Sequence, residues 1–163
     1  MLFVIELATR RVQIAGIAPE PDNAWVVQCS RQLPDAVDGF LIGKRFLLHD
    51  RDPLFSEAFR ETLAATGVQA VRLPPRAPNL NAHAERYVRI IKEACLDRMI
   101  FVGERSLRRA ITEFVTHYHH ERNHQGLGNV LLFPHRVQPR RDERVVCRER
   151  LGGLLKYYHR PAA

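Results

Sequence analysis

Short apolar runs separated by polar breaks fill the first half of the chain, and they predict strands. Residues 2–6 and 12–17 are rich in β-branched and other apolar side chains, and a short turn containing Arg10 and Arg11 separates them. Such a pair is typical of two adjacent strands. Residues 45–49 and 68–73 predict two further strands. We expect the strand at 45–49 to be buried, because its apolar residues are nearly continuous.

Two helices are predicted between these strands. Asp22 is suited to cap the start of the first helix, and Ser56 the start of the second. In the second helix Phe59, Leu63 and Ala64 are expected to face inward, and a glycine soon afterwards is typical of a helix end.

In the second half of the chain the apolar residues recur at the spacing typical of helices. Residues 81–98 and 106–122 are helical segments, the latter with apolar positions at helical spacing. The order β-β-α-β-α-β-α-α predicts an α/β domain with a mixed sheet and helices packed on it. Beyond Gly128 the pattern decays, and six arginines lie between residues 136 and 150. We expect a loosely attached basic extension there.

Size and charge narrow the class of protein. The chain has 163 residues, of which 45% are hydrophobic, enough for one globular domain with its own core. No apolar run is long enough for a transmembrane helix, and the start lacks the basic region of a signal peptide. We therefore expect a cytoplasmic protein with no membrane partner.

The net charge of +7 favours a polyanion such as nucleic acid as the partner. Three widely spaced cysteines without a CxxC pair predict neither disulfides nor a cysteine zinc site.

Two aspartates, Asp50 and Asp52, follow the strand predicted at 45–49. The carboxyl ends of strands are where α/β folds place ligands. A solvated turn explains the same two residues, because aspartate is common in turns. Both interpretations stay open at this point.

The helix predicted from residue 81 has two different faces. Glu85, Arg89 and Lys92 stand at i, i+4 and i+7, so they form one polar stripe. The other side is apolar and is expected to pack on a core; it consists of Tyr87, Val88, Ile91, Ala94 and Cys95. The stripe could bind a ligand, or it could be an ordinary surface salt bridge between Glu85 and Arg89.

Four sequence motifs follow one another along the chain. VIELATRRVQIAG covers the first two predicted strands, HDRDPLF contains Asp50, and PNLNAHAER contains Glu85, with 34 residues between the two carboxylates. YHHERNHQGL is similar to a YNxxRxHxxL pattern, with His119 in place of the asparagine. In this order they resemble the catalytic core of bacterial insertion-sequence DDE transposases and retroviral-type integrases. The resemblance covers residues 1–128 and leaves 129–163 as a basic C-terminal extension.

The resemblance implies a ribonuclease H-like fold, with helices on both faces of a mixed sheet. It also implies metal-dependent DNA cleavage and strand transfer, in which Asp50 and Glu85 are catalytic and bind Mg²⁺ or Mn²⁺. Hard divalent cations prefer carboxylate oxygens, and two of them can activate both the attacking and the leaving oxygen. Arg86, Arg89 and Lys92 match the positions where the family places DNA-contacting residues. DNA is the expected partner, and a nucleoid-associated location in the cytoplasm follows.

The family's first catalytic aspartate lies on a strand that precedes the one matching residues 2–6. We therefore expect an N-terminally truncated core without its first strand, and little or no activity from two carboxylates. The alternative is a non-enzymatic DNA-binding or oligomerisation remnant, which would form homodimers or mixed oligomers with a full-length transposase.

Residues 120–124 also spell HExxH, the pattern of zinc metalloproteases. That motif needs both histidines on one continuing helix and a third ligand. Because glycines follow closely and no third ligand is evident, we expect no zinc site here.

Overall fold

The computed structural model describes residues 1–35, 39–76, 78–134 and 144–161. It contains two compact units, and each is described here by itself. One unit comprises Met1–Glu6 and Val12–Ala84, and the other comprises Leu7–Arg11 and Glu85–Ala163.

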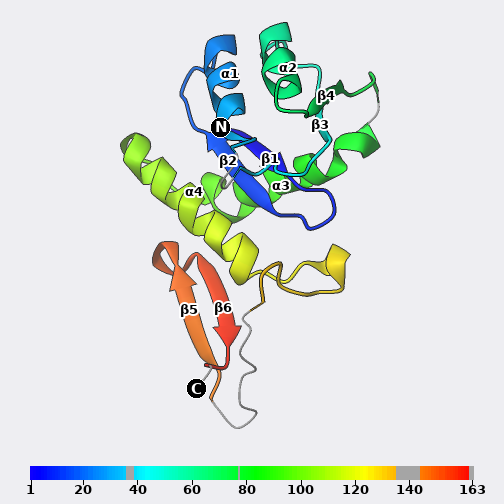
Figure 1. Cartoon of the computed structure of the whole chain (residues 1–163). Coiled ribbons are helices and arrows are strands. Elements are labelled where there is room, and N and C mark those ends of the chain that lie inside the picture. Colours follow the sequence, from blue (N-terminus) through cyan, green and yellow to red (C-terminus); the bar gives the residue numbers. More distant parts are fainter. Residues whose placement is uncertain (36–38, 77, 135–143, 162–163) are drawn as a thin grey trace. The chain divides into compact units, whose positions relative to one another are not determined.

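The first unit alternates strands and helices in the predicted order (Figure 1). Its strands are β1 (Leu2–Ile5), β2 (Val12–Gly16), β3 (Phe46–His49) and β4 (Gln69–Arg72), and its helices are α1 (Asn23–Gln32) and α2 (Glu57–Ala64). β1 pairs with β2 in antiparallel register, whereas β3 and β4 are parallel. A crossover helix is the usual way to join two parallel strands, and α2 serves that purpose between β3 and β4.

Both predicted helix caps are confirmed. The Asp22 carboxylate accepts a 2.7 Å hydrogen bond from the Trp25 amide, and the Ser56 hydroxyl accepts one of 3.4 Å from the Phe59 amide. These bonds satisfy amide groups that have no partner within the first turn of a helix. The helices then pack over the strands with a core that consists of Val26, Leu33, Phe40, Leu41, Phe59, Leu63 and Val68.

Two predictions about burial in this unit are wrong. In β3, Phe46 is 53% exposed and Leu48 is 43% exposed, so the strand is not buried on both faces. Side chains alternate across a strand, and only the face with Leu47 and His49 turns toward the core. Ala64 is also exposed, because it lies well off the helical stripe that Phe59 and Leu63 share.

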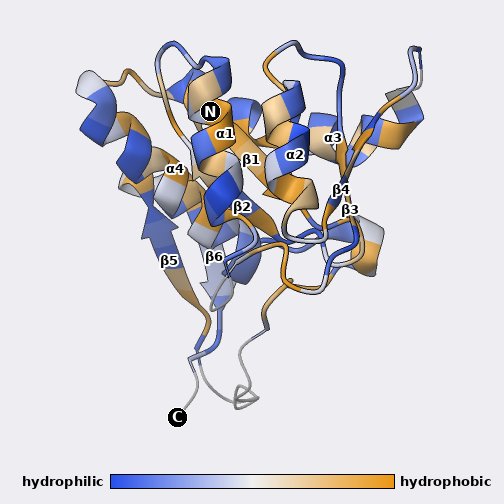
Figure 2. Cartoon of the chain, turned by 45° about the horizontal axis from the view of Figure 1, so that its top comes forward, coloured by the Kyte–Doolittle hydropathy of each residue, from blue (hydrophilic) through white to orange (hydrophobic). Residues whose placement is uncertain are grey.

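Two long helices provide most of the helical residues of the second unit. A 3₁₀ turn, Pro78–Asn81, leads into α3 (Ala82–Ala94), and a second 3₁₀ turn, Leu96–Arg98, precedes α4 (Gly103–His120). The first three residues of α3 are grouped with the first unit. The helix predicted over 81–98 is thus shorter than expected, since the backbone leaves helical geometry at Cys95. Figure 2 shows polar and apolar stripes along α4.

The core of this unit lies between α3 and α4, as the apolar face of α3 predicts. Tyr87 is buried, and its ring centroid lies 5.2 Å from that of Tyr118 and 6.2 Å from that of Phe114. Ile91 and Cys95 continue the same buried face of α3. Aromatic rings bury large apolar areas, so this cluster contributes to the core of the unit.

The C-terminal residues form a hairpin that the sequence analysis missed. β5 (Val146–Arg150) and β6 (Leu155–His159) pair in antiparallel register and lie beside α4 (Figure 1). Leu155 is buried, and Arg150 forms ion pairs with Glu113 and Glu121. The expectation of a loosely attached segment is therefore wrong for residues 146–159. Arg136, Arg140 and Arg141 of the basic tail lie outside the described residues, and a domain boundary at residue 128 stays a prediction.

The mixed α/β class is confirmed. Over the residues described, the strands form three two-stranded sheets, two of them antiparallel and one parallel. A single mixed sheet of the ribonuclease H-like type stays a prediction. No described helix combines the length and the hydropathy needed to cross a membrane.

Candidate metal and nucleic-acid site

Asp50 lies at the carboxyl end of β3, as the sequence predicts, and its side chain is exposed. Its Oδ1 accepts a 3.0 Å hydrogen bond from the Asp52 amide, and the Asp52 Oδ1 accepts one of 2.9 Å from the Leu54 amide. These are two consecutive Asx turns, in which a side-chain carboxylate oxygen takes the place of the backbone carbonyl of a tight turn. The turn interpretation thus holds for both aspartates, and it leaves the exposed Asp50 carboxylate able to bind a further ligand.

His49, the last residue of β3, orients the backbone at Asp50. The imidazole is 5% exposed, and its Nδ1 donates a 2.8 Å hydrogen bond to the Asp50 carbonyl. The ring lies 4.9 Å from Phe55 and 5.7 Å from Phe59, between centroids. Burial in this aromatic setting lowers the pKa of His49, so the ring is neutral at pH 7. Sequence reasoning gave His49 no role, because only its burial and its bond to Asp50 reveal one.

Glu85 lies in the first turn of α3, and its side chain is exposed. Arg86, Arg89 and Lys92 are exposed as well, whereas Tyr87, Ile91 and Cys95 are buried. The two faces predicted for this helix are therefore confirmed. Glu85 and Arg89 form no salt bridge in the part of the chain that the structure describes. The ordinary surface ion pair thus does not account for the stripe.

The two candidate metal ligands belong to different units, Asp50 to the first and Glu85 to the second. Each provides exposed carboxylate oxygens, the ligands that Mg²⁺ and Mn²⁺ prefer. A cluster of three or more His, Cys, Asp or Glu side chains suited to a metal ion does not occur among the described residues.

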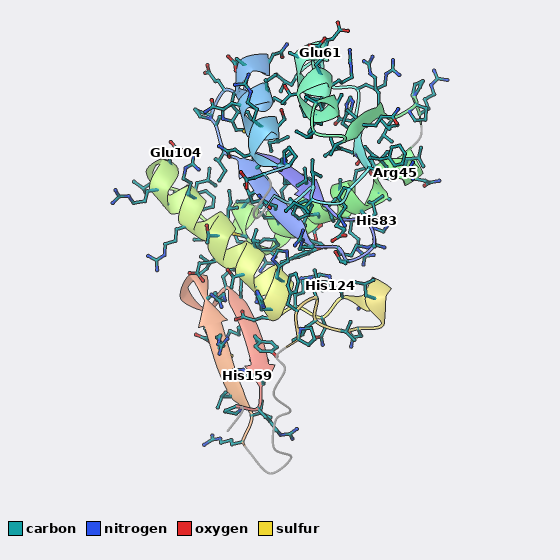
Figure 3. The ribbon with its side chains drawn as sticks, viewed as in Figure 1. Arg45, Glu61, His83, Glu104, His124 and His159 are labelled. Carbon is teal, nitrogen blue, oxygen red and sulfur yellow. The ribbon has the colours of Figure 1, made fainter. Side chains whose placement is uncertain are left out.

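The HExxH residues do not form a zinc site. α4 ends at His120 and Glu121 is its C-cap, so His124 lies outside the helix, at the end of α4 in Figure 3. The Nε2 of His124 donates a 2.8 Å hydrogen bond to the Tyr118 carbonyl. The break in the helix separates the two histidines, as the nearby glycines predict.

Glu121, the acid of that motif, has a structural role instead. Its carboxylate is fully buried and accepts hydrogen bonds from Arg150, with Nε–Oε2 at 2.8 Å and Nη2–Oε1 at 2.7 Å. Arg148 Nη1 at 3.4 Å and His117 Nδ1 at 3.1 Å complete the set. Burial alone would raise the pKa of Glu121, but the bonds from Arg150 and His117 outweigh it and lower the pKa to about 2. Glu121 is therefore a charged anchor for β5 rather than a general base.

Comparison with protein-family models gives one match, which covers α3 and α4. Residues 66–130 match the family model described as "Integrase core domain". Over this segment the chain is similar to the integrase core family. The sequence-based resemblance to an integrase or transposase catalytic core is thereby confirmed. No curated protein and no solved structure matches the chain.

The integrase core segment contains α3 with all of its exposed charged residues, and it continues through α4 to residue 130. Asp50 precedes the segment. The family match therefore bears directly on the helix of Glu85 and not on the turn that follows β3.

Proposed function

We propose that the chain is a catalytic-core portion of a DNA recombinase of the integrase and transposase type, which binds DNA as its substrate. This proposal rests on the exposed residues of helix α3. Within the integrase core segment, this helix exposes Glu85 together with Arg86, Arg89 and Lys92, while its opposite face is buried. A carboxylate flanked by cations can hold a metal ion beside a phosphate group of the DNA.

In this proposal Asp50 and Glu85 are catalytic residues that bind a divalent metal, Mg²⁺ or Mn²⁺. The bound metal would polarise the scissile phosphate and help to deprotonate the attacking hydroxyl or water. The chain's own residues hold and orient it: the Asx turn fixes the Asp50 carboxylate, and His49 fixes the backbone of Asp50. Arg86, Arg89 and Lys92 bind DNA phosphates, which positions the duplex without reading its sequence.

We infer that two carboxylates alone support little or no strand transfer. A two-metal site needs more oxygen ligands than two side chains provide, and the described residues bring no third acid or histidine into a metal-binding group.

The same observation favours a second candidate function, a non-enzymatic DNA-binding or oligomerisation module. Such a module would act as a homodimer or as a mixed oligomer with a full-length transposase, and it would be found with the nucleoid. The exposed cations of α3 serve this function as well as the first.

Titration of the chain with Mn²⁺, followed by the electron paramagnetic resonance signal of the free ion, distinguishes the two functions. Under the enzymatic proposal, Asp50→Asn and Glu85→Gln each weaken Mn²⁺ binding about tenfold or more, because each removes a charged ligand. Asp97→Asn is the matched control, since Asp97 is also an exposed carboxylate. Equal titration curves for all four proteins would eliminate the metal site and leave the DNA-binding module.

A further inference from the structure

The segment between α3 and α4 exposes two apolar side chains almost completely. Ile100 is 94% exposed and Val102 is 85% exposed, more than any other large apolar side chain that the structure describes. Single exposed apolar residues are normal on a protein surface, but neighbours of this kind on one short segment are typical of a contact site. The whole segment belongs to the second unit.

The backbone of this segment is extended, as in a strand. Met99 has a φ of −131° and a ψ of 145°, and Val102 has a φ of −102° and a ψ of 96°. Successive side chains of an extended chain point to opposite sides. In agreement with this, Ile100 and Val102 are exposed, whereas Met99 and Phe101 are partly buried. The two exposed side chains therefore lie on the same side of the segment.

The backbone polar groups at the centre of the segment are available for pairing. In the part of the chain that the structure describes, Ile100 and Phe101 form no backbone–backbone hydrogen bond. Exposed extended backbone of this kind can pair with another extended segment, as the edge strand of a sheet does. The segment thus offers both apolar side chains and main-chain groups to a partner.

The sequence around Phe101 is complementary to itself. When two copies of the segment pair in antiparallel register with Phe101 at the two-fold axis, Ile100 of each copy lies opposite Val102 of the other. The same register sets Arg98 opposite Glu104 of the other copy, so an apolar pair and an ion pair each occur twice. Both kinds of cross-strand pair stabilise antiparallel strands, and a two-fold interface needs this self-complementarity. A second copy of the chain therefore fits the segment better than a chemically different partner.

Arg98 and Glu104 are exposed, and each keeps atoms available for such a contact. The Nε of Arg98 donates a 2.7 Å hydrogen bond to the Glu93 carbonyl, which leaves the two terminal nitrogens for other acceptors. Glu104 lies at the start of α4 (Figure 3) and pairs with Arg108 through its Oε1. An exposed ion pair of this kind contributes little to stability, so it does not prevent a second contact by Glu104.

We propose that residues 98–104 form a self-association surface, on which a second copy of the chain pairs in antiparallel register across Phe101. This inference rests on the oligomerisation of the second candidate function and gives it a surface, and it does not depend on DNA binding. Interfaces that bury less than about 1,200 Å² are typical of transient complexes. Two segments of this length are at the small end of that scale, so the dimer is reversible and forms at high protein concentration.

Sedimentation equilibrium of the full chain without DNA, over a wide range of protein concentration, measures the association. The test variant is Ile100→Ser with Val102→Ser. The control is Ile42→Ser with Val130→Ser, the same residue types at other exposed positions. We expect the test variant to associate at least about tenfold more weakly than the control, because four apolar side chains lose their burial in the dimer. Equal association of the two variants would overturn the surface, and so would a wild type that is monomeric at every concentration.

Exchange of the charged residues tests the register. Arg98→Glu alone and Glu104→Arg alone each set like charges opposite one another and should weaken association about threefold or more. The double variant Arg98→Glu with Glu104→Arg should associate like the wild type. A double variant as weak as the single ones would overturn the antiparallel register and the proposal with it.

Failure of this inference is distinguishable from failure of the proposed DNA function. A wild type that associates but binds no DNA duplex would overturn the DNA function and leave the self-association surface intact. A wild type that binds DNA but stays monomeric would overturn the surface alone.

Discussion

Arg150 on β5 and Glu121 at the end of α4 form a two-point ion pair, with Nε–Oε2 at 2.8 Å and Nη2–Oε1 at 2.7 Å. The pair joins residues that are 29 positions apart and fastens the C-terminal hairpin to α4. Glu113 accepts a third bond from the same guanidinium, at 2.7 Å. The hairpin is thus held by a buried charge pair in addition to apolar packing at Leu155.

Arg150→Met should destabilise the second unit strongly, because it leaves the Glu121 carboxylate buried with weaker partners. Breaking a buried pair on one side costs about 3–5 kcal/mol of unfolding free energy. Lys156→Met is the matched control, since Lys156 pairs with Glu149 on the exposed face of the same hairpin and should contribute little to stability. Urea unfolding of both variants measures the difference. Similar losses in the two would show that the network around Glu121 does not anchor the hairpin.

The same ion pair predicts a dependence of stability on pH. The pKa of Glu121 falls from its ordinary value of 4.5 to about 2 on folding. A depressed carboxyl pKa stabilises the folded state fully above pH 4.5, and this stabilisation is lost as the pH falls toward 2. The shift corresponds to about 3 kcal/mol.

Unfolding free energies of the wild type and Glu121→Gln, measured at several values of pH from 6 to 2, test this prediction. The advantage of the wild type should shrink between pH 4.5 and 2 and be constant above pH 5. A constant difference over the whole range would contradict the assignment of the low pKa to Glu121.

Local signals in the sequence were sufficient for much of the fold. The caps at Asp22 and Ser56 depend on one side chain and an amide three residues later, so short segments reveal them. The two faces of α3 follow from helical spacing alone. The hairpin was missed because the paired face of β5 is charged, with Arg148 and Arg150 directed at Glu121. These contacts depend on Glu121, a residue far away in the sequence, so no local sequence pattern predicts them.

The positions of the candidate site residues were predictable to a similar degree. Asp50 follows a strand and Glu85 lies at the start of a helix, as the sequence predicted, and both are exposed; their role as metal ligands stays a prediction. His49 was not found, because its bond to the Asp50 carbonyl is visible only in three dimensions. The burial of β3 was overestimated, since an apolar sequence does not specify how many of its faces are covered.

Close packing between β2 and α1 predicts that Gly16 tolerates no side chain. A Cβ atom at Gly16 would lie 2.6 Å from Trp25 Cζ2 and 2.7 Å from Cys29 Sγ. Gly16→Ala should therefore force α1 away from β2 and lower the unfolding free energy by about 1–3 kcal/mol. Gly126→Ala is the control, because a Cβ atom there meets nothing within 4 Å. Thermal unfolding compares the two, and an equal melting temperature for both variants would contradict the close approach.

The cationic stripe of α3 predicts a salt-dependent loss of DNA binding when its charges are removed. Arg89 and Lys92 are exposed one turn apart on the helix that carries Glu85. The double variant Arg89→Gln with Lys92→Gln should lower the slope of log affinity against log salt by about 1.8, because each phosphate contact contributes about 0.9. The weakening should be the same for duplexes of different sequence, since phosphate contacts carry no information about the bases.

Anisotropy titrations with two unrelated duplexes measure both effects, and Arg31→Gln with Arg105→Gln provides the charge-matched control. A loss confined to one duplex would mean that α3 reads bases, and an unchanged slope would mean that DNA binds elsewhere on the chain.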